Sequence, residues 1–367
     1  MWEARGFVLP DDKLLSLQSP AMKFDVFLPS LLVSPDWFTD SVPPRVPAIE
    51  TLMAHGTTRI GGEWPGILLS SFGLRDTQGI AALSALGDEI EVGDHGWMFA
   101  EPAHFQADRD TLNLLPCSQL DINASEAAQL IDALNANFAD RGLQFAYGNS
   151  GNWYVRCSVD ELPQTMSIFS ARRGALFEKL PQSRGKLSWK AIQNEAQMLF
   201  HSHAVNEARE DAGKLTINGL WFWGEGALPT MPVGLKPGIG VVFGGSALVG
   251  GLAKRVDARF APIAQLTVAD TISSAERNLL AIDTLTIPVE RGDTNAWREA
   301  ALKLDAQFFA LLLTALRAGT LDELILTLPR ERDSLVFTIE KQSLRGVVGW
   351  WKNLTQKTHS FLESSLA

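Results

Sequence analysis

The chain has 367 residues, of which 46% are hydrophobic and 20% are charged, a composition typical of a folded protein rather than a disordered one. That length exceeds one hydrophobic core and predicts two domains. The formal net charge is −10 and the one basic patch lies near the C-terminus, which argues against nucleic acid as a general partner. The two cysteines, Cys117 and Cys157, have neither a metal-binding spacing nor the pattern of a disulfide framework.

The N-terminal part of the chain has the order of a parallel α/β protein. The apolar stretch KFDVFLPSLL predicts a strand that leads into a proline-rich loop at residues 34–47, and residues 47–56 then predict a helix. The longest apolar stretch, FFALLLTAL, is too short to span a bilayer, and no signal-type segment is found. We therefore expect a cytoplasmic protein with no transmembrane segment.

Residues 201–232 place polar side chains in an apolar frame at irregular spacing. His203, Asn206 and Arg209 fall at i, i+3 and i+6 of a predicted helix, so they lie on overlapping parts of one face. The stretch INGLWFWGEG then predicts a buried strand that ends in a tight loop. The glycine-rich stretch at residues 234–256 lacks the spacing of a phosphate-binding loop, and it predicts a strand followed by a helix.

These motifs resemble the archaeal-type cofactor-independent phosphoglycerate mutases, a branch of the alkaline phosphatase superfamily. The family reads roughly H-P-V-N-x-x-R, then G-K, then N-x-x-W-x-W-G-x-G-x-x-P-x-x-P. This chain matches it with His203, Val205, Asn206, Arg209, Gly213, Lys214, Asn218, Trp221, Trp223, Gly224, Gly226, Pro229 and Pro232, and has Ala204 in place of the first proline. Residues 46–56 and 78–94 resemble two further family segments. Among the relatives, a group of bacterial RpfE-type regulatory proteins looks most similar.

The resemblance implies an α/β fold with an alkaline-phosphatase-like core, a mostly parallel sheet and an α+β insert domain. It places the core in residues 1–97 and 205–345 and the insert in residues 98–204. Residues 346–367 then form a C-terminal amphipathic tail, whose tryptophans we expect to pack onto the core rather than onto a membrane.

The chemistry of the family requires a serine nucleophile and two divalent metals held by aspartate and histidine. Where the family has P-G-S-D, this chain reads Pro65, Gly66, Ile67, Leu68, and where the family opens with D-G it reads Pro29, Ser30. Of the family's E-x-P-D-x-x-x-H, Asp293 remains as a remnant and Trp297 replaces the histidine. Pro329, Arg330, Glu331 and Arg332 stand in place of a later D-H pair. We therefore expect no catalytic residue, no metal and no cofactor.

We accordingly predict a catalytically degenerate phosphoglycerate-mutase-like protein with a regulatory or metabolite-sensing role. The alternative is an active mutase or related phosphoryl-transfer enzyme that binds manganese or zinc through displaced ligands, drawn from Asp293, Glu290, His55, His95, His201 and His203.

Two groups of residues carry further expectations. The candidates for ligand binding are Arg156, Arg172, Arg173, Arg330 and Arg332. For Arg156, Arg172 and Arg173, a solvated surface position is the favoured interpretation. If several converge, they favour a small phosphorylated or carboxylated metabolite, and if they scatter, they favour a protein partner. His203, Asn206, Arg209, Asn218 and Trp221 are predicted to form a buried junction that ties the insert to the core, with Arg209 paired to an acid.

Overall fold

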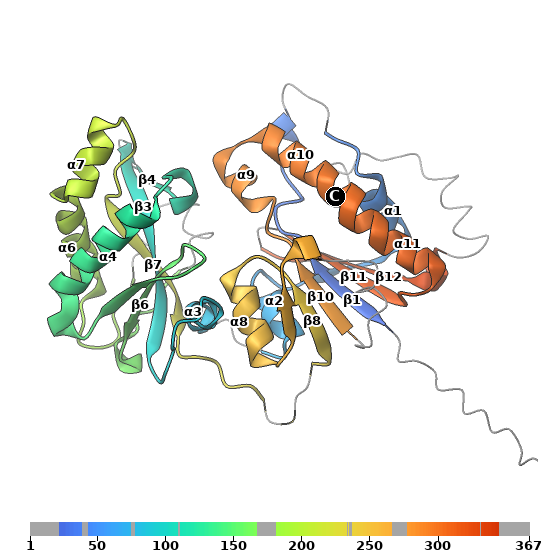
Figure 1. The fold of residues 1–367 in the computed structure, drawn as a ribbon, viewed down its shortest axis with the longest axis horizontal. Coiled ribbons are helices and arrows are strands. Elements are labelled where there is room, and N and C mark those ends of the chain that lie inside the picture. Colours follow the sequence, from blue (N-terminus) through green and yellow to red (C-terminus); the bar gives the residue numbers. More distant parts are fainter. Residues whose placement is uncertain are drawn as a thin grey trace, which may run out of the picture.

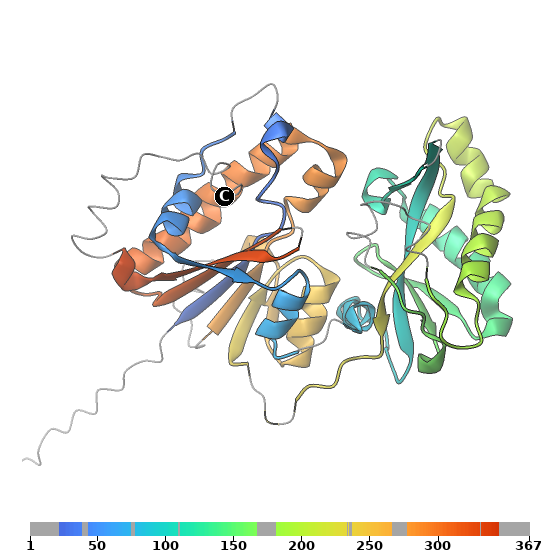
Figure 2. The same cartoon turned by 180° about the vertical axis from the view of Figure 1, so that it is seen from behind.

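The computed structural model describes residues 22–38, 43–74, 78–108, 111–166, 181–232, 234, 237–265, 277–330 and 332–344. Within them the chain forms two lobes, each built on one sheet, with helix α3 (Ile80–Gly87) between them (Figures 1 and 2). None of the described helices is long and apolar enough to cross a bilayer. The predicted tail at residues 346–367 lies outside the described residues.

The core lobe contains a mostly parallel sheet. Its seven described strands have the order β2-β12-β11-β1-β10-β8-β9. They are β1 (Lys23–Phe27), β2 (Thr57–Gly61), β8 (Ile239–Phe243), β9 (Arg259–Ala261), β10 (Arg277–Ala281), β11 (Glu323–Pro329) and β12 (Ser334–Glu340). Only β12 and β2, at one edge, run antiparallel to their neighbours. The prediction of an α/β fold with a mostly parallel sheet is confirmed.

Helices cover both faces of this sheet, which explains why β1 is apolar on both sides. Phe24 and Val26 pack in one apolar cluster, and Phe27 packs in another on the opposite face. The first face is covered by α1 (Pro47–His55), α10 (Thr294–Leu304) and α11 (Ala310–Ala318), and the second by α2 (Gly66–Ser71), α3 and α8 (Ala247–Arg255) (Figure 1). A short helix, α9 (Thr286–Arg291), follows β10.

A π-helical turn, Asp305–Phe309, connects α10 to α11. It aims the buried Asp305 carboxylate at the first turn of α1, where Oδ1 accepts from the Ile49 amide at 2.8 Å and Oδ2 accepts from the Ala48 amide at 3.2 Å. Amides at a helix start have no partner within their own helix, so this carboxylate satisfies two of them.

The insert lobe contains an antiparallel sheet of five described strands. They are β3 (Gly96–Asp108), β4 (Thr111–Leu115), β5 (Gln144–Tyr147), β6 (Trp153–Cys157) and β7 (Gly219–Gly226). The long strand β3 pairs with β4, β6 and β7 along different parts of its length. Helices α4 (Ala124–Phe138), α6 (Trp189–His201) and α7 (Ala204–Asp211) lie on one face of the sheet (Figure 1).

The boundary expected at residues 204/205 falls inside the insert lobe. Strand β7 pairs with β3, and Val205, Ile217 and Leu220 share one apolar cluster with α4 and α6. Without β7, one side of β3 would be an open edge, and α7 would lose the surface that buries Val205. We therefore propose that the insert extends from residue 96 to residue 226.

Helix α3 belongs to the packing of both lobes. Its buried residues share one apolar cluster with Trp97 and Tyr154 of the insert lobe and with residues of the core lobe. It also crosses α8 in direct backbone contact, because a Cβ on Gly87 would lie 1.8 Å from the Ala247 carbonyl oxygen and a Cβ on Gly251 would lie 1.8 Å from the Leu83 carbonyl oxygen. Only glycine fits at either position.

A second contact joins the two lobes at a place separate from α3. There the 3-10 turn η2 (Cys117–Gln119) of the insert meets α9 of the core. Gln119 Nε2 donates to the Glu290 carbonyl at 2.6 Å. Arg291 donates to the Ser118 carbonyl at 2.7 Å and pairs with Asp121 at 2.6 Å.

Candidate functional site

The carboxyl ends of the parallel strands β1, β10, β8 and β11 lie at one edge of the core sheet, the edge where ligands bind in α/β proteins. Ser30 follows β1, and its φ of 62° is uncommon for a residue other than glycine. Asp283 follows β10, and a Cβ on Gly245, in the loop after β8, would lie 3.4 Å from its Oδ1. The side chain of Asp283 reaches solvent on one side, but nearby protein removes part of its hydration and raises its pKa.

Sequence reasoning missed Asp283. An acidic residue directly after the apolar strand NLLAI was the signal that could have found it.

An aromatic cluster joins two positions at which the sequence resemblance would place metal ligands. Trp297 stands where the resemblance would place a histidine, and it donates from Nε1 to the carbonyl oxygen of Ser30, where the resemblance would place the opening aspartate, over 2.8 Å. The indole is buried and packs edge-on against Trp37 and Phe38, with ring centroids 5.8 and 5.4 Å away. An indole N–H only donates, so Trp297 offers a metal no lone pair.

The other positions that the resemblance implies are used for structure. Asp293 caps α10, because its Oδ1 accepts from the Ala296 amide at 2.9 Å. Ile67 and Leu68, where the resemblance would place the nucleophile, lie in α2, and Leu68 is fully buried there. Among the residues that the structure describes, no group of three or more His, Cys, Asp or Glu side chains could hold a metal ion.

The candidate arginines do not converge within the described chain. Arg330 forms a bidentate ion pair with Asp333, at 2.7 and 2.9 Å, in the turn between β11 and β12. Arg332 is exposed in the same turn. Arg156 lies on β6 of the insert lobe. Arg172 and Arg173 lie outside the described residues.

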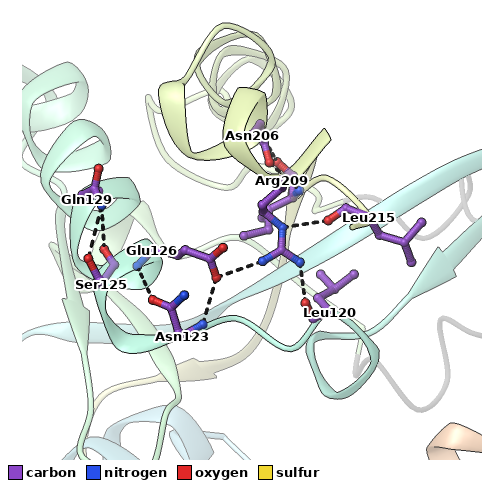
Figure 3. A network of polar contacts seen from close by, with 9 residues as sticks. Leu120, Asn123, Ser125, Glu126, Gln129, Asn206, Arg209 and Leu215 are labelled. Carbon is purple, nitrogen blue, oxygen red and sulfur yellow. Dashed lines mark hydrogen bonds and ion pairs between the residues drawn. The ribbon is translucent and has the colours of Figure 1, made fainter. Parts of the chain in front are cut away.

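Arg209 is the centre of a buried polar network in the insert lobe (Figure 3). Its Nε donates to the Leu215 carbonyl at 2.8 Å, and its Nη2 donates to the Leu120 carbonyl. Its Nη1 pairs with Glu126 at 2.9 Å. Glu126 also closes the capping box of α4, since its carboxylate accepts from the Asn123 amide at 2.9 Å. One arginine thereby ties α7 to the start of α4.

The remaining junction residues also bond within the insert lobe. Asn206 makes three hydrogen bonds, two with Ile217 and one with the Phe200 carbonyl, and Asn218 makes two with the backbone of Phe105. His203 caps α7, and the buried Trp221 donates to the Met166 carbonyl. Within the insert as we delimit it, these hydrogen bonds tie its helices to its own sheet.

Two grooves in the described part of the chain are large enough for a small molecule. The first has a volume of about 860 Å³ and is lined only by insert-lobe residues and the loop before β3, at positions 94–95, 135, 139, 142–144 and 156–159. The second, of about 870 Å³, lies beside the connections between the lobes, at positions 73–74, 78, 159–160, 162–165, 184, 225–230 and 232. Of the predicted ligand-binding residues in the described part of the chain, Arg156 lines the first of these two grooves.

Comparison with known proteins gives one informative sequence match, and no protein-family model matches the chain. Over 160 residues, 42% of this chain, the sequence is 24% identical to the probable 2,3-bisphosphoglycerate-independent phosphoglycerate mutase of Geobacter sulfurreducens. The match spans 39% of that protein.

Two solved structures match the chain over most of its length. A protein from Pyrococcus horikoshii matches with a TM-score of 0.50 and 13% identity, over 93% of this chain and 100% of that one. A cofactor-independent phosphoglycerate mutase from Thermoplasma acidophilum matches with a TM-score of 0.42 and 16% identity, over 87% and 90% of the two chains. On the sequence match, the chain is a distant homologue of the cofactor-independent phosphoglycerate mutases.

Proposed function

We propose that this protein is a non-catalytic relative of the cofactor-independent phosphoglycerate mutases, with an alkaline-phosphatase-like core, and that it acts in regulation or metabolite sensing. The contact between Trp297 and Ser30 carries this proposal. A binuclear metal site needs anionic or imidazole ligands to replace the water around each ion. Here the two matching positions are joined by an indole-to-carbonyl hydrogen bond inside an aromatic cluster.

The nucleophile position supports the same proposal. Ile67 and Leu68 have no group that could accept a phosphoryl group, and α2 buries Leu68 in the apolar cluster below the sheet. Asp283 remains as a carboxylate at the ligand edge, but one carboxylate does not make a binuclear site. The residues present therefore do not fit the metals of the family.

The spread of the arginines favours a protein partner over a metabolite held between the lobes. Arg330 is already neutralised by Asp333 within its own turn, and Arg156 lies on the other lobe. A regulatory role also agrees with the sequence resemblance to the RpfE-type regulatory proteins. We propose that this chain is one of that group.

Metal content and turnover test the proposal directly. The purified full chain is loaded with manganese or zinc, freed of unbound metal and measured by elemental analysis. It is then assayed for conversion of 3-phosphoglycerate to 2-phosphoglycerate with added manganese, beside an active mutase as positive control. We expect no stoichiometric metal and no conversion. Metal-stimulated turnover would overturn the proposal and support the active enzyme.

A further inference from the structure

The groove at the end of the insert sheet contains two basic side chains that the structure leaves unused. Arg156 is half-buried on β6, and His95 is exposed directly before β3. Both line the groove of about 860 Å³. Neither side chain makes a hydrogen bond or an ion pair with another residue in the described part of the chain. An arginine that is partly desolvated without a carboxylate partner is available to an anion from solution.

The strand register brings these two residues together. Arg156 stands opposite Trp97 of β3 on one side and opposite Gln144 of β5 on the other. His95 precedes β3 by one residue and Trp97 by two, so continuing the alternation of the strand puts it on the same side of the sheet as Arg156, and both residues line one groove. Gln144 adds an amide from the neighbouring strand and lines the same groove.

The remaining polar groups of the groove limit what it can bind. Asp94 also lines it and opposes a ligand with several negative charges, but its carboxylate can accept from a hydroxyl group. The Asn135 side chain is occupied by the backbone of Phe145, at 3.0 and 2.7 Å. Burial raises the pKa of the Cys157 thiol to about 12, so that thiol stays neutral.

We propose that this groove is a binding site for a small hydroxylated metabolite that carries a carboxylate or phosphate group. The anionic end pairs with Arg156 and His95, and a hydroxyl group donates to Asp94. The volume lies within the range of small-molecule sites, roughly 300 to 1,000 Å³. Every lining residue comes from positions 94–159, so the site goes beyond the proposed function and does not depend on whether the metal centre is lost.

Calorimetric titration of the full chain at low salt tests the site with three probes. These are 3-phosphoglycerate, glycerol 3-phosphate, which offers the phosphate alone, and glycerate, which offers the carboxylate alone. We expect at least one to bind, and the better of the two simpler probes identifies the anionic group. Arg156→Gln should weaken binding about tenfold or more, because a charge-assisted hydrogen bond contributes about 1.5 to 3 kcal/mol.

Matched variants make the result specific. Arg156→Lys should restore part of the affinity by returning the charge without the planar fork. Arg59→Gln removes one exposed arginine from β2 of the core lobe and should leave binding unchanged. His95→Gln, at an exposed position, serves as the second test if Arg156→Gln does not fold.

The outcomes separate this site from the proposed function. If none of the probes binds at millimolar concentration, or if binding survives both Arg156→Gln and His95→Gln, the proposal is overturned. Either result leaves the proposed loss of catalysis unaffected, because metal content and turnover test that loss separately.

Discussion

Replacing Arg209 with alanine should destabilise the insert lobe far more than removing an arginine from its surface. The side chain is 2% exposed and donates to three acceptors on two other segments. After Arg209→Ala, the Leu120 carbonyl loses its donor and the Glu126 carboxylate loses its charged partner, keeping only the Asn123 amide, whereas water can reach the carbonyl of the exposed Leu215. A buried acceptor left without a partner costs about 1 to 3 kcal/mol, and breaking a buried ion pair costs about 3 to 5 kcal/mol.

We therefore expect a loss of about 3 kcal/mol in the free energy of unfolding. That corresponds to a fall in Tm of roughly 10 °C if the insert lobe unfolds as a unit. Urea and thermal unfolding followed by circular dichroism measure both quantities. The matched control is Arg141→Ala in the same lobe, where the ion pair to Glu195 is open to solvent and little change is expected. If the two variants lose the same stability, the network around Arg209 does not support the lobe as argued.

Three further perturbations address the core lobe and the contact between the lobes. Trp297→Phe should cost about 1 kcal/mol by leaving the Ser30 carbonyl without its donor, and Trp297→Ala about 3 to 5 kcal/mol by also opening a cavity, as urea unfolding will show; equal losses would contradict the role of the hydrogen bond. Burial raises the pKa of the Asp305 carboxyl, so its contribution to stability is present at low pH and is lost as the pH rises from the ordinary carboxyl range through the raised pKa. As the pH rises through that range, the free energy of unfolding of Asp305→Asn should therefore increase relative to that of the parent protein, as urea unfolding at a series of pH values will show. A difference between the two proteins that does not change with pH would refute this. Arg291→Ala removes the ion pair to Asp121 and should speed amide hydrogen exchange at residues 117–121 and 286–292. Exchange that stays unchanged there would show that the contact does not hold the lobes together.

Local sequence patterns predicted the elements but not the contacts between distant ones. The stretch KFDVF is apolar because both faces of β1 are covered, and period and length sufficed to identify it as a strand. The polar residues Asn206 and Arg209 were identified as a buried junction because they stand in an apolar frame. Which lobe they support depends on the pairing of β7 with β3 across more than a hundred residues, and no local pattern encodes that pairing.

The candidate site shows the same limit. The sequence resemblance places Trp297 where the family has a histidine, but it could not predict the partner of the indole, the carbonyl of Ser30, because that is a backbone group 267 positions away. Asp293 was interpreted as a metal remnant, although Asp followed by a helical stretch is also the pattern of a helix cap, and the structure shows that cap. The groove at Arg156 depends on strand register, which the sequence does not specify for a strand apolar on both faces.

The order of the strands has a consequence for how the chain folds during synthesis. The central strand β1 is made well before its two neighbours, β10 and β11, which begin at residues 277 and 323. The core sheet can therefore form only after β11 has left the ribosome, and contacts so distant in sequence are slow to form. The insert lobe is continuous from residue 96 to residue 226 and is complete much earlier. During that interval the apolar strand β1 remains unpaired, which makes it the segment of the nascent chain most in need of protection from aggregation.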